Sequence, residues 1–335
     1  MLIAFLLSLA SAWALTGLVR HYAVKRSLMD IPNGRSSHSV PTPRGGGLAI
    51  ILVLLPLLAW QWQLGWLGDS TLLALLAPTL LLALVGWLDD LWSLPAKARF
   101  AVQGIAALAG LLALQALPTL PLFGWQLPLD GWLLPLLLLV LLWLTNLYNF
   151  MDGIDGIAAL EAISVLAGAA LLLAGLGEAA RSALLLLLCA PLVGFLVWNF
   201  PPARIFMGDV CSAPLGLLLG LLGVWLAAQT GLNLWAWLIL LGVFVVDASW
   251  TLLVRMLSGQ RWSQPHRSHS YQILARRCGG HRPVSLAVAA INLIWLLPWS
   301  WLAVRYPGAG LFCLLAACMP LGLVCYKVGA GKPES

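Results

Sequence analysis

Long apolar runs separated by short polar connections dominate this chain. A bilayer-spanning helix needs about 20 apolar residues, and about eleven runs approach that length, centred roughly at residues 10, 54, 79, 109, 140, 167, 191, 221, 245, 294 and 318. Together they leave little chain for a separate soluble domain. The pattern therefore predicts an all-α, polytopic helical membrane bundle in which residues 1–335 form one integral domain.

The composition agrees with this prediction. Of the 335 residues, 61% are hydrophobic and only 9% are charged, and the mean hydropathy is +0.95. Soluble domains carry about 25% charged residues, so this chain belongs to the membrane class. The first apolar run has no basic segment before it, and we therefore expect a retained first helix rather than a cleaved signal peptide.

The basic residues predict the orientation. If the connections after the odd-numbered runs share one side with the C-terminus, that side holds all of the 18 lysines and arginines except Arg181 and Arg305. Positive charge marks the cytoplasmic side, which places the N-terminus outside and the C-terminus in the cytoplasm. The pI of about 9.2 reflects this bias and contact with anionic inner-membrane lipids; nothing indicates nucleic-acid binding. The stretch Pro118–Gly131, on the other side, is expected to form a turn or hairpin.

Five acidic residues follow three apolar runs on the predicted cytoplasmic side. Asp89 and Asp90 follow the third run, Asp152 and Asp155 the fifth, and Asp209 the seventh. A carboxylate at the centre of a bilayer helix costs about 2.5–3.5 kcal/mol, so acids near spans are functional candidates. Helix packing can bring the three connections together, and five ionised carboxylates then need a compensating cation. Mg²⁺, which prefers oxygen ligands and keeps waters for a phosphate, meets that need, and Mn²⁺ can replace it.

Each acidic group has a simpler interpretation that the sequence leaves open. Asp152 and Asp155 would share one face of a helix, with glycines beside them that let a ligand approach, or they cap a softened helix end and are only solvated. Glu161 and Asp247 lie inside apolar runs. They are either functional or buried acids paired with a polar neighbour.

Basic groups in the same connections suit a phosphate ligand. Arg35, Arg44 and the run Gly45–Gly47 precede the second apolar run, where three glycines either expose backbone amides to an anion or form a flexible turn. Lys97 and Arg99 follow the acidic pair. Further groups are His266, Arg267 and His269 in the last large connection. The catalytic and binding residues are therefore expected in cytoplasmic connections at about residues 35–47, 89–99, 146–157, 199–212 and 257–283.

Five motifs in order resemble a known family. They are Thr42–Gly47, Asp89–Asp90 with Lys97, Asn146–Gly156, Asn199–Asp209 and His266–His269. This order is similar to the polyprenyl-phosphate N-acetylhexosamine-1-phosphate transferases, the superfamily of WecA and MraY. The resemblance implies an enzyme that transfers a sugar 1-phosphate from a UDP-N-acetylhexosamine to undecaprenyl phosphate and releases UMP. It also implies a bacterial inner membrane, with the N-terminus in the periplasm and the active site facing the cytoplasm. A homodimer is one assembly that it leaves open.

The resemblance also implies residue roles. Asp209 and Asn149 would hold Mg²⁺ against the pyrophosphate, and Phe206, Asp152 and Asp155 would seat the uridine. Asp89, supported by Asp90, would act as a base or orient the lipid phosphate. The remaining candidates are phosphate- and substrate-contacting groups: Lys97, Arg267, His269, His266, Arg44 and Asn199.

The chain departs from the family pattern at two places. Cys211 stands where the family often has glycine, and His269 is followed by Ser270, Tyr271 and Gln272 rather than by a run of histidines. The second departure argues against the muramoyl-peptide enzymes and is closer to the O-antigen priming branch of WecA and WbpL, whose sugars are N-acetylated hexosamines, some of them 6-deoxy. The alternative function is a polytopic transporter or lipid flippase, which would place its ionisable groups near mid-membrane at broken helices.

Overall fold

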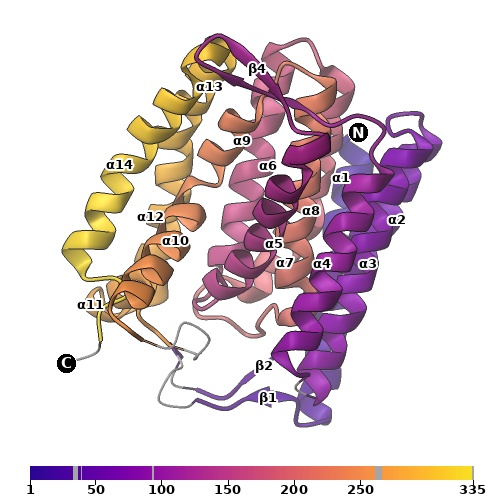
Figure 1. The fold of residues 1–335 in the computed structure, drawn as a ribbon. Coiled ribbons are helices and arrows are strands. Elements are labelled where there is room, and N and C mark those ends of the chain that lie inside the picture. Colours follow the sequence, from indigo (N-terminus) through magenta and orange to yellow (C-terminus); the bar gives the residue numbers. More distant parts are fainter. Residues whose placement is uncertain (33–36, 39, 93, 261–265, 334–335) are drawn as a thin grey trace.

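The computed structural model describes residues 1–32, 37–38, 40–92, 94–260 and 266–333. Arg35 and parts of the predicted connections 35–47 and 257–283 lie outside the described residues. In the described part the chain is helical almost throughout, as predicted, with two small sheets (Figure 1). The long helices are α1 (Leu2–Lys25), α2 (Gly47–Gln63), α3 (Asp69–Trp92), α4 (Ala96–Ala113), α5 (Leu134–Met151), α6 (Ile157–Gly175), α7 (Ala179–Asn199), α8 (Asp209–Gln229), α10 (Gly242–Leu257) and α14 (Gly310–Val328).

Shorter elements complete the bundle. They are α9 (Leu234–Leu240), α11 (Ser270–Arg277), α12 (His281–Ile291), the π-helical segment η2 (Asn292–Leu296), α13 (Leu297–Arg305), and the 3₁₀ turns η1 (Gly131–Leu133) and η3 (Pro307–Ala309). Within the described residues, nine helical stretches are long and apolar enough to cross a membrane. The pair α9 and α10, bent by 78°, makes a tenth candidate, whereas α2 is shorter, at 17 residues. Each predicted apolar run coincides with one of these stretches.

Glycines set how closely the central helices approach. Helix α8 is buried on nearly all sides, between α3 and α5. A Cβ on Gly216 would lie 2.6 Å from the carbonyl oxygen of Leu144 in α5, and one on Gly86 would lie 2.1 Å from that of Asp209. Because these positions lack a side chain, the end of α3 and the beginning of α8 meet backbone to backbone. That contact brings the acids of α3 beside Asp209.

The two small sheets lie at opposite ends of the bundle (Figure 1). Strands β3 (Thr119–Leu122) and β4 (Trp125–Pro128) form an antiparallel hairpin, which confirms the hairpin expected within Pro118–Gly131. Strands β1 (Met29–Asp30) and β2 (Thr42–Pro43) pair at the other end of the bundle, which also carries the C-terminus. The N-terminus lies at the hairpin end, so the termini are at opposite ends of the bundle.

The glycine run before α2 packs against a neighbouring segment. Of the two interpretations that the sequence left open, exposed amides are contradicted at Gly46 and Gly47. The amide of Gly46 donates to the carbonyl of Phe206 (2.9 Å), and that of Gly47 donates to the carbonyl of Met207 (2.8 Å). A Cβ on Gly47 would lie 2.2 Å from the Cβ of Cys211. The run therefore fixes the segment before α2 against the segment before α8, and its amides at these two positions are not available to an anion.

Candidate active site

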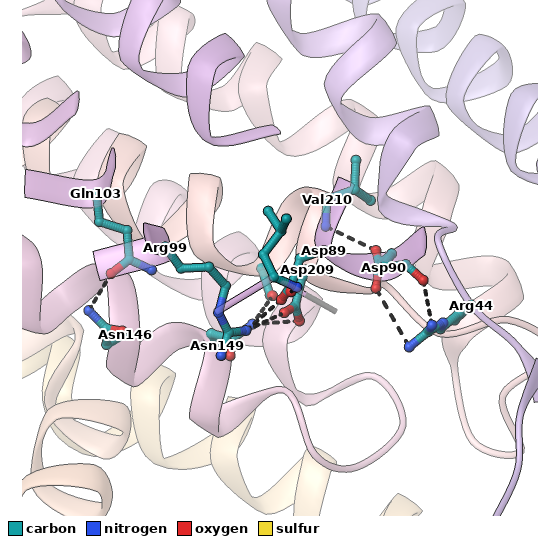
Figure 2. A network of polar contacts seen from close by, with 11 residues as sticks. Arg44, Asp89, Asp90, Arg99, Gln103, Asn146, Asn149, Asp209 and Val210 are labelled. Carbon is teal, nitrogen blue, oxygen red and sulfur yellow. Dashed lines mark hydrogen bonds and ion pairs between the residues drawn. The ribbon is translucent and has the colours of Figure 1, made fainter. Parts of the chain in front are cut away.

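Arg99 joins two carboxylates from different helices. Its Nη1 lies 2.5 Å from Oδ2 of Asp89, at the end of α3, and 3.4 Å from Oδ2 of Asp209, the first residue of α8. The side chain of Asp89 is 8% exposed and that of Asp209 is 34% exposed. Figure 2 shows the three side chains converging. Asp209 therefore remains open to a ligand, whereas Asp89 is held by the guanidinium and by the amide of Leu94 (2.6 Å).

Asn149 adds a third helix to this cluster. Its Nδ2 donates to Oδ1 of Asp209 and to the hydroxyl of Ser212, both at 2.8 Å. One turn earlier on α5, Asn146 donates to Oε1 of Gln103 in α4 (2.8 Å; Figure 2). Helices α3, α4, α5 and α8 are thus tied together at one end by side chains, as the predicted grouping of Asp89, Asn149 and Asp209 requires.

Asp90 faces a second cation beside this cluster. Its Oδ2 accepts from the amide of Val210 (3.3 Å), and its Oδ1 lies 4.0 Å from Nη1 of Arg44. Arg44 also donates to the backbone carbonyl of Asp90. The predicted pairing of the Arg44 segment with the acidic pair is therefore present, on the opposite side of Asp90 from the cluster of Asp89 and Asp209 (Figure 2).

Asp152 ends α5 inside a region of concentrated negative charge. Burial, reinforced by the charges of Asp209, Asp155 and Asp90, raises the pKa of the Asp152 carboxyl well above its ordinary value. A carboxyl in this situation ionises readily only when a cation arrives. The electrostatics of the site therefore favour a positively charged ligand close to Asp152 and Asp209.

The side chains of Asp155 and Asn199 already have polar partners within the protein. Oδ1 of Asp155 lies 3.0 Å from Nδ1 of His281, and its Oδ2 accepts from the amide of Ala203 (2.9 Å). Asn199 accepts from the amide of Gly156 and donates to the carbonyl of Ile205, both at 2.9 Å. These contacts fix the turn between α5 and α6 against the segment 199–205. Substrate roles for both residues stay predictions.

The histidine loop is anchored by Asp247, one of the two acids whose role the sequence left open. Its carboxylate accepts from the amides of Ser270 (3.0 Å) and Tyr271 (2.9 Å), the first residues of α11, and lies 3.3 Å from Nδ1 of His269. His266 stacks on His269 with ring centroids 4.9 Å apart. Burial, together with His269 and Arg255, lowers the pKa of His266 to about 3. His266 is therefore neutral at physiological pH.

The remaining predicted contacts lie at the margins of the cluster. Lys97 is exposed at the beginning of α4, and within the described ranges no hydrogen bond or ion pair links it to the carboxylates. Phe206 packs edge-on against His38 (centroids 4.9 Å apart). Arg267 lines a separate cavity with residues of α11 and the C-terminal segment. Phosphate contacts by Lys97 and Arg267 stay predictions.

Glu161, the other acid in an apolar run, is paired within the bundle. It is fully buried in α6, and its Oε2 accepts from Nδ2 of Asn292 (2.5 Å) at the beginning of η2. This contact links two membrane-spanning segments and lies apart from the Asp89–Asp209 cluster. The interpretation of Glu161 as a buried acid paired to a polar neighbour is the one that the structure supports.

Known proteins resemble the chain over most of its length. Residues 72–227 match the family described as Glycosyl transferase family 4. A Bacillus subtilis (strain 168) protein named probable undecaprenyl-phosphate N-acetylglucosaminyl 1-phosphate transferase is 33% identical over 298 residues, which cover 88% of this chain and 82% of the relative. The chain belongs to Glycosyl transferase family 4.

Other relatives in this family have related names. A Synechococcus sp. (strain JA-3-3Ab) phospho-N-acetylmuramoyl-pentapeptide-transferase is 39% identical over 241 residues, covering 64% of each chain. A Mycolicibacterium smegmatis decaprenyl-phosphate N-acetylglucosaminephosphotransferase is 30% identical over 303 residues, covering 82% of this chain and 75% of the relative. The resemblance to the WecA and MraY superfamily is thereby confirmed. The relatives include both N-acetylglucosamine 1-phosphate transferases and a muramoyl-pentapeptide transferase, so membership of the O-antigen priming branch stays a prediction.

The residues present suit the Mg²⁺ that the family resemblance implies. Among the described residues, no three acidic, histidine or cysteine side chains are placed to chelate one ion. The partly exposed carboxylate of Asp209 instead offers oxygen ligands. Asn149, whose Nδ2 donates to Asp209, would add its own Oδ1 once that amide turns over. Burial, reinforced by the neighbouring carboxylates, raises the pKa of Asp152, and a bound cation would favour its ionised form. Mg²⁺ characteristically binds through one or two carboxylates and completes its shell with water and substrate phosphate. This Glycosyl transferase family 4 site has that composition.

Proposed function

We propose that this chain transfers an N-acetylhexosamine 1-phosphate from a UDP-sugar to a polyprenyl phosphate such as undecaprenyl phosphate. An oxygen of the lipid phosphate forms a bond to the sugar-bearing phosphorus, the bond from that phosphorus to the bridging oxygen breaks, and UMP leaves. The observation that carries this proposal is the cluster of Asp89, Arg99, Asn149 and Asp209 at one end of a membrane bundle. The names of the relatives supply the reaction class.

Phosphoryl transfer depends on positioning and charge neutralisation, and the cluster can supply both. In this proposal Asp209 and Asn149 would hold Mg²⁺, and the bound ion would supply charge neutralisation for the pyrophosphate. Arg99 holds Asp89 in place. Asp89, supported by Asp90, orients the lipid phosphate, which is already ionised near neutral pH and needs no strong base.

The other residues are proposed to bind the two substrates. Asp152, Asp155 and Phe206 lie beside the cluster where a nucleotide can be seated. Arg44, Lys97, Arg267, His266 and His269 contact phosphates, and Asn199 orders the turn beside the nucleotide. The sugar is proposed to be an N-acetylated hexosamine, including the 6-deoxy class, that initiates an O-antigen-type surface glycan.

The site is proposed to face the cytoplasm of a bacterial inner membrane. It lies at the end of the bundle that carries the C-terminus and strands β1 and β2 (Figure 1). Nearly all lysines and arginines fall in the connections assigned to this end from the sequence, which supports the orientation through the positive-inside preference. Nucleotide sugars are available on that side.

A transporter or lipid flippase is the second candidate. The broken span of α9 and α10, bent by 78°, is a feature that transporters share. The carboxylates Asp89, Asp90 and Asp209, however, lie at helix termini at one end, and Arg99 and Arg44 neutralise two of them. This arrangement favours the transferase.

The test is a reaction of the purified protein with undecaprenyl phosphate, Mg²⁺ and a panel of UDP-sugars, followed by UMP release. Asp209→Ala should abolish release, while Asp130→Asn, an exposed acid at the hairpin end, should leave it unchanged. Absence of UMP with every UDP-sugar, or full activity of Asp209→Ala, would refute the proposal. A transporter would instead move a substrate across vesicles without UMP release.

A further inference from the structure

A cation-lined cavity lies where α11 meets the end of α14. It has a volume of about 400 Å³ and is lined by Arg267, Arg276, Arg277 and Lys332, together with apolar residues such as Ile273 and Val328. None of its described lining residues is acidic. The charges of Arg277 and Lys332 attract an anion to this cavity, and the apolar part of the wall indicates an anion with a hydrocarbon portion.

The wall of this cavity is built by the C-terminal segment, which is fixed in place. The amide of Gly331 donates to the carbonyl of Ser268 (2.9 Å), and its own carbonyl accepts from Nε2 of Gln260 (2.9 Å). Arg277 donates to the carbonyl of Val328 (3.1 Å), and Arg276 donates to that of Arg267 (3.1 Å). These bonds hold Arg276, Arg277 and the backbone of the C-terminal segment in place around the cavity.

An exposed apolar stripe on α14 leads to the cavity. Its members recur every three or four residues and so lie on one face of the helix. They are Phe312, Leu315, Met319, Leu323 and Tyr326, each more than half exposed. The stripe ends one residue before Lys327, and the ammonium of Lys332 lies 5.9 Å from the centre of the Tyr326 ring. Acyl chains along this stripe would place a headgroup at the cavity.

We propose that this cavity and the α14 stripe form a binding site for one anionic phospholipid, with the phosphate in the cavity and the acyl chains along α14. The pairing of a basic cavity with a continuous apolar path matches an amphipathic anion. A free phosphate or a nucleotide would use the cavity alone. Arg267 lines this cavity and is also proposed as a substrate contact, so the site is tested at Arg277 and Lys332, which the proposed sugar transfer does not use.

The experiment is native mass spectrometry of the full chain, purified in detergent and titrated with phosphatidylglycerol, phosphatidylethanolamine or inorganic phosphate. We expect one phosphatidylglycerol to be retained in preference to phosphatidylethanolamine. The variant Arg277→Gln/Lys332→Gln should bind it about thirtyfold more weakly if the two charges act independently. The variant Arg277→Lys/Lys332→Arg keeps both charges and should retain the lipid.

A matched control separates this site from the general attraction of a basic surface. Lys25→Gln/Arg26→Gln removes two charges at the end of α1, outside the cavity, and should leave binding unchanged. Equal weakening in both neutralised variants, or equal retention of the two phospholipids, would overturn the proposal. Competition by inorganic phosphate would assign the cavity to free anions. A lipid-independent dimer lost in Leu315→Asn would assign the stripe to a second copy of the chain.

Discussion

A Cβ atom on Gly86 would lie 2.1 Å from the carbonyl oxygen of Asp209, so α3 and α8 touch through their backbones beside the candidate metal ligand. Gly86→Ala should therefore push α8 away from α3. Overpacking of this kind costs about 1–3 kcal/mol. Displacing Asp209 by about 1 Å should lower kcat by roughly a hundredfold. Thermal unfolding in detergent and the UMP-release assay measure the two effects.

Gly104→Ala is the matched control for this substitution. Gly104 also lies inside a helix, but no heavy atom stands within 4 Å of the position of an added Cβ. Helix propensity alone predicts a gain of up to about 1 kcal/mol. Activity at the wild-type level in Gly86→Ala, with an unchanged Tm, would contradict the close approach of α3 and α8.

The bridge from Arg99 to Asp89 and Asp209 predicts opposite effects on turnover and on cation binding. In Arg99→Gln, Asp89 loses its partner, and kcat should fall by roughly 10²–10³-fold. The half-saturating Mg²⁺ concentration should nevertheless decrease, because the nearby positive charge that competes for Asp209 is gone. Arg99→Lys should recover only part of the activity, since an ammonium is a single point charge.

Steady-state UMP release at varied Mg²⁺ tests this prediction. Arg305→Gln, at the hairpin end of the bundle, serves as the control for the loss of one positive charge. An unchanged kcat in Arg99→Gln would show that the bridge has no part in turnover. A smaller loss of kcat in Arg99→Gln than in Lys97→Gln would favour Lys97, the cation that the sequence predicts beside the acidic pair.

The membrane architecture could be predicted from the sequence because twenty-residue apolar runs have few other structural solutions. The gathering of Asp89, Asn149 and Asp209 followed from placing their helix ends on one side. The identity of the bridging cation did not follow, because Lys97 and Arg99 are two residues apart and the rotation of α4 decides which one faces α8. The role of the glycine run stayed open in the sequence because the amides of Gly46 and Gly47 pair with Phe206 and Met207, which are distant in sequence.

The raised pKa of Asp152 predicts a pH-dependent stability that a cation removes. Because the folded state binds this proton more tightly than the unfolded state, stability is highest below the unfolded pKa of about 4 and declines as pH rises through the folded value. Without divalent cations, Asp152→Asn should therefore exceed the wild-type Tm near pH 7 and match it near pH 4.

Thermal unfolding between pH 4 and pH 8, in the presence of a chelator and then of Mg²⁺, measures this effect. Mg²⁺ should restore the wild-type Tm near pH 7, because it compensates the charges of Asp152 and Asp209, and it should act less on Asp152→Asn. A pH-independent difference between the two proteins would mean that the substitution acts through packing rather than through ionisation.

The contacts of Asp247 predict that Asp247→Asn loosens α11 locally without unfolding the helical bundle. Its two oxygens accept from the amides of Ser270 and Tyr271 and face Nδ1 of His269. In Asp247→Asn one acceptor becomes an N–H that opposes a donor, which costs about 1–3 kcal/mol locally. Hydrogen–deuterium exchange should increase over residues 270–277, and kcat should fall by about tenfold or more as the histidine loop loses its position.

Thr251→Val, which removes one hydroxyl donor to Asp247 (3.1 Å), should change neither by a comparable amount. Unchanged exchange in α11 together with lost activity would give Asp247 a direct part in the reaction rather than a positioning one.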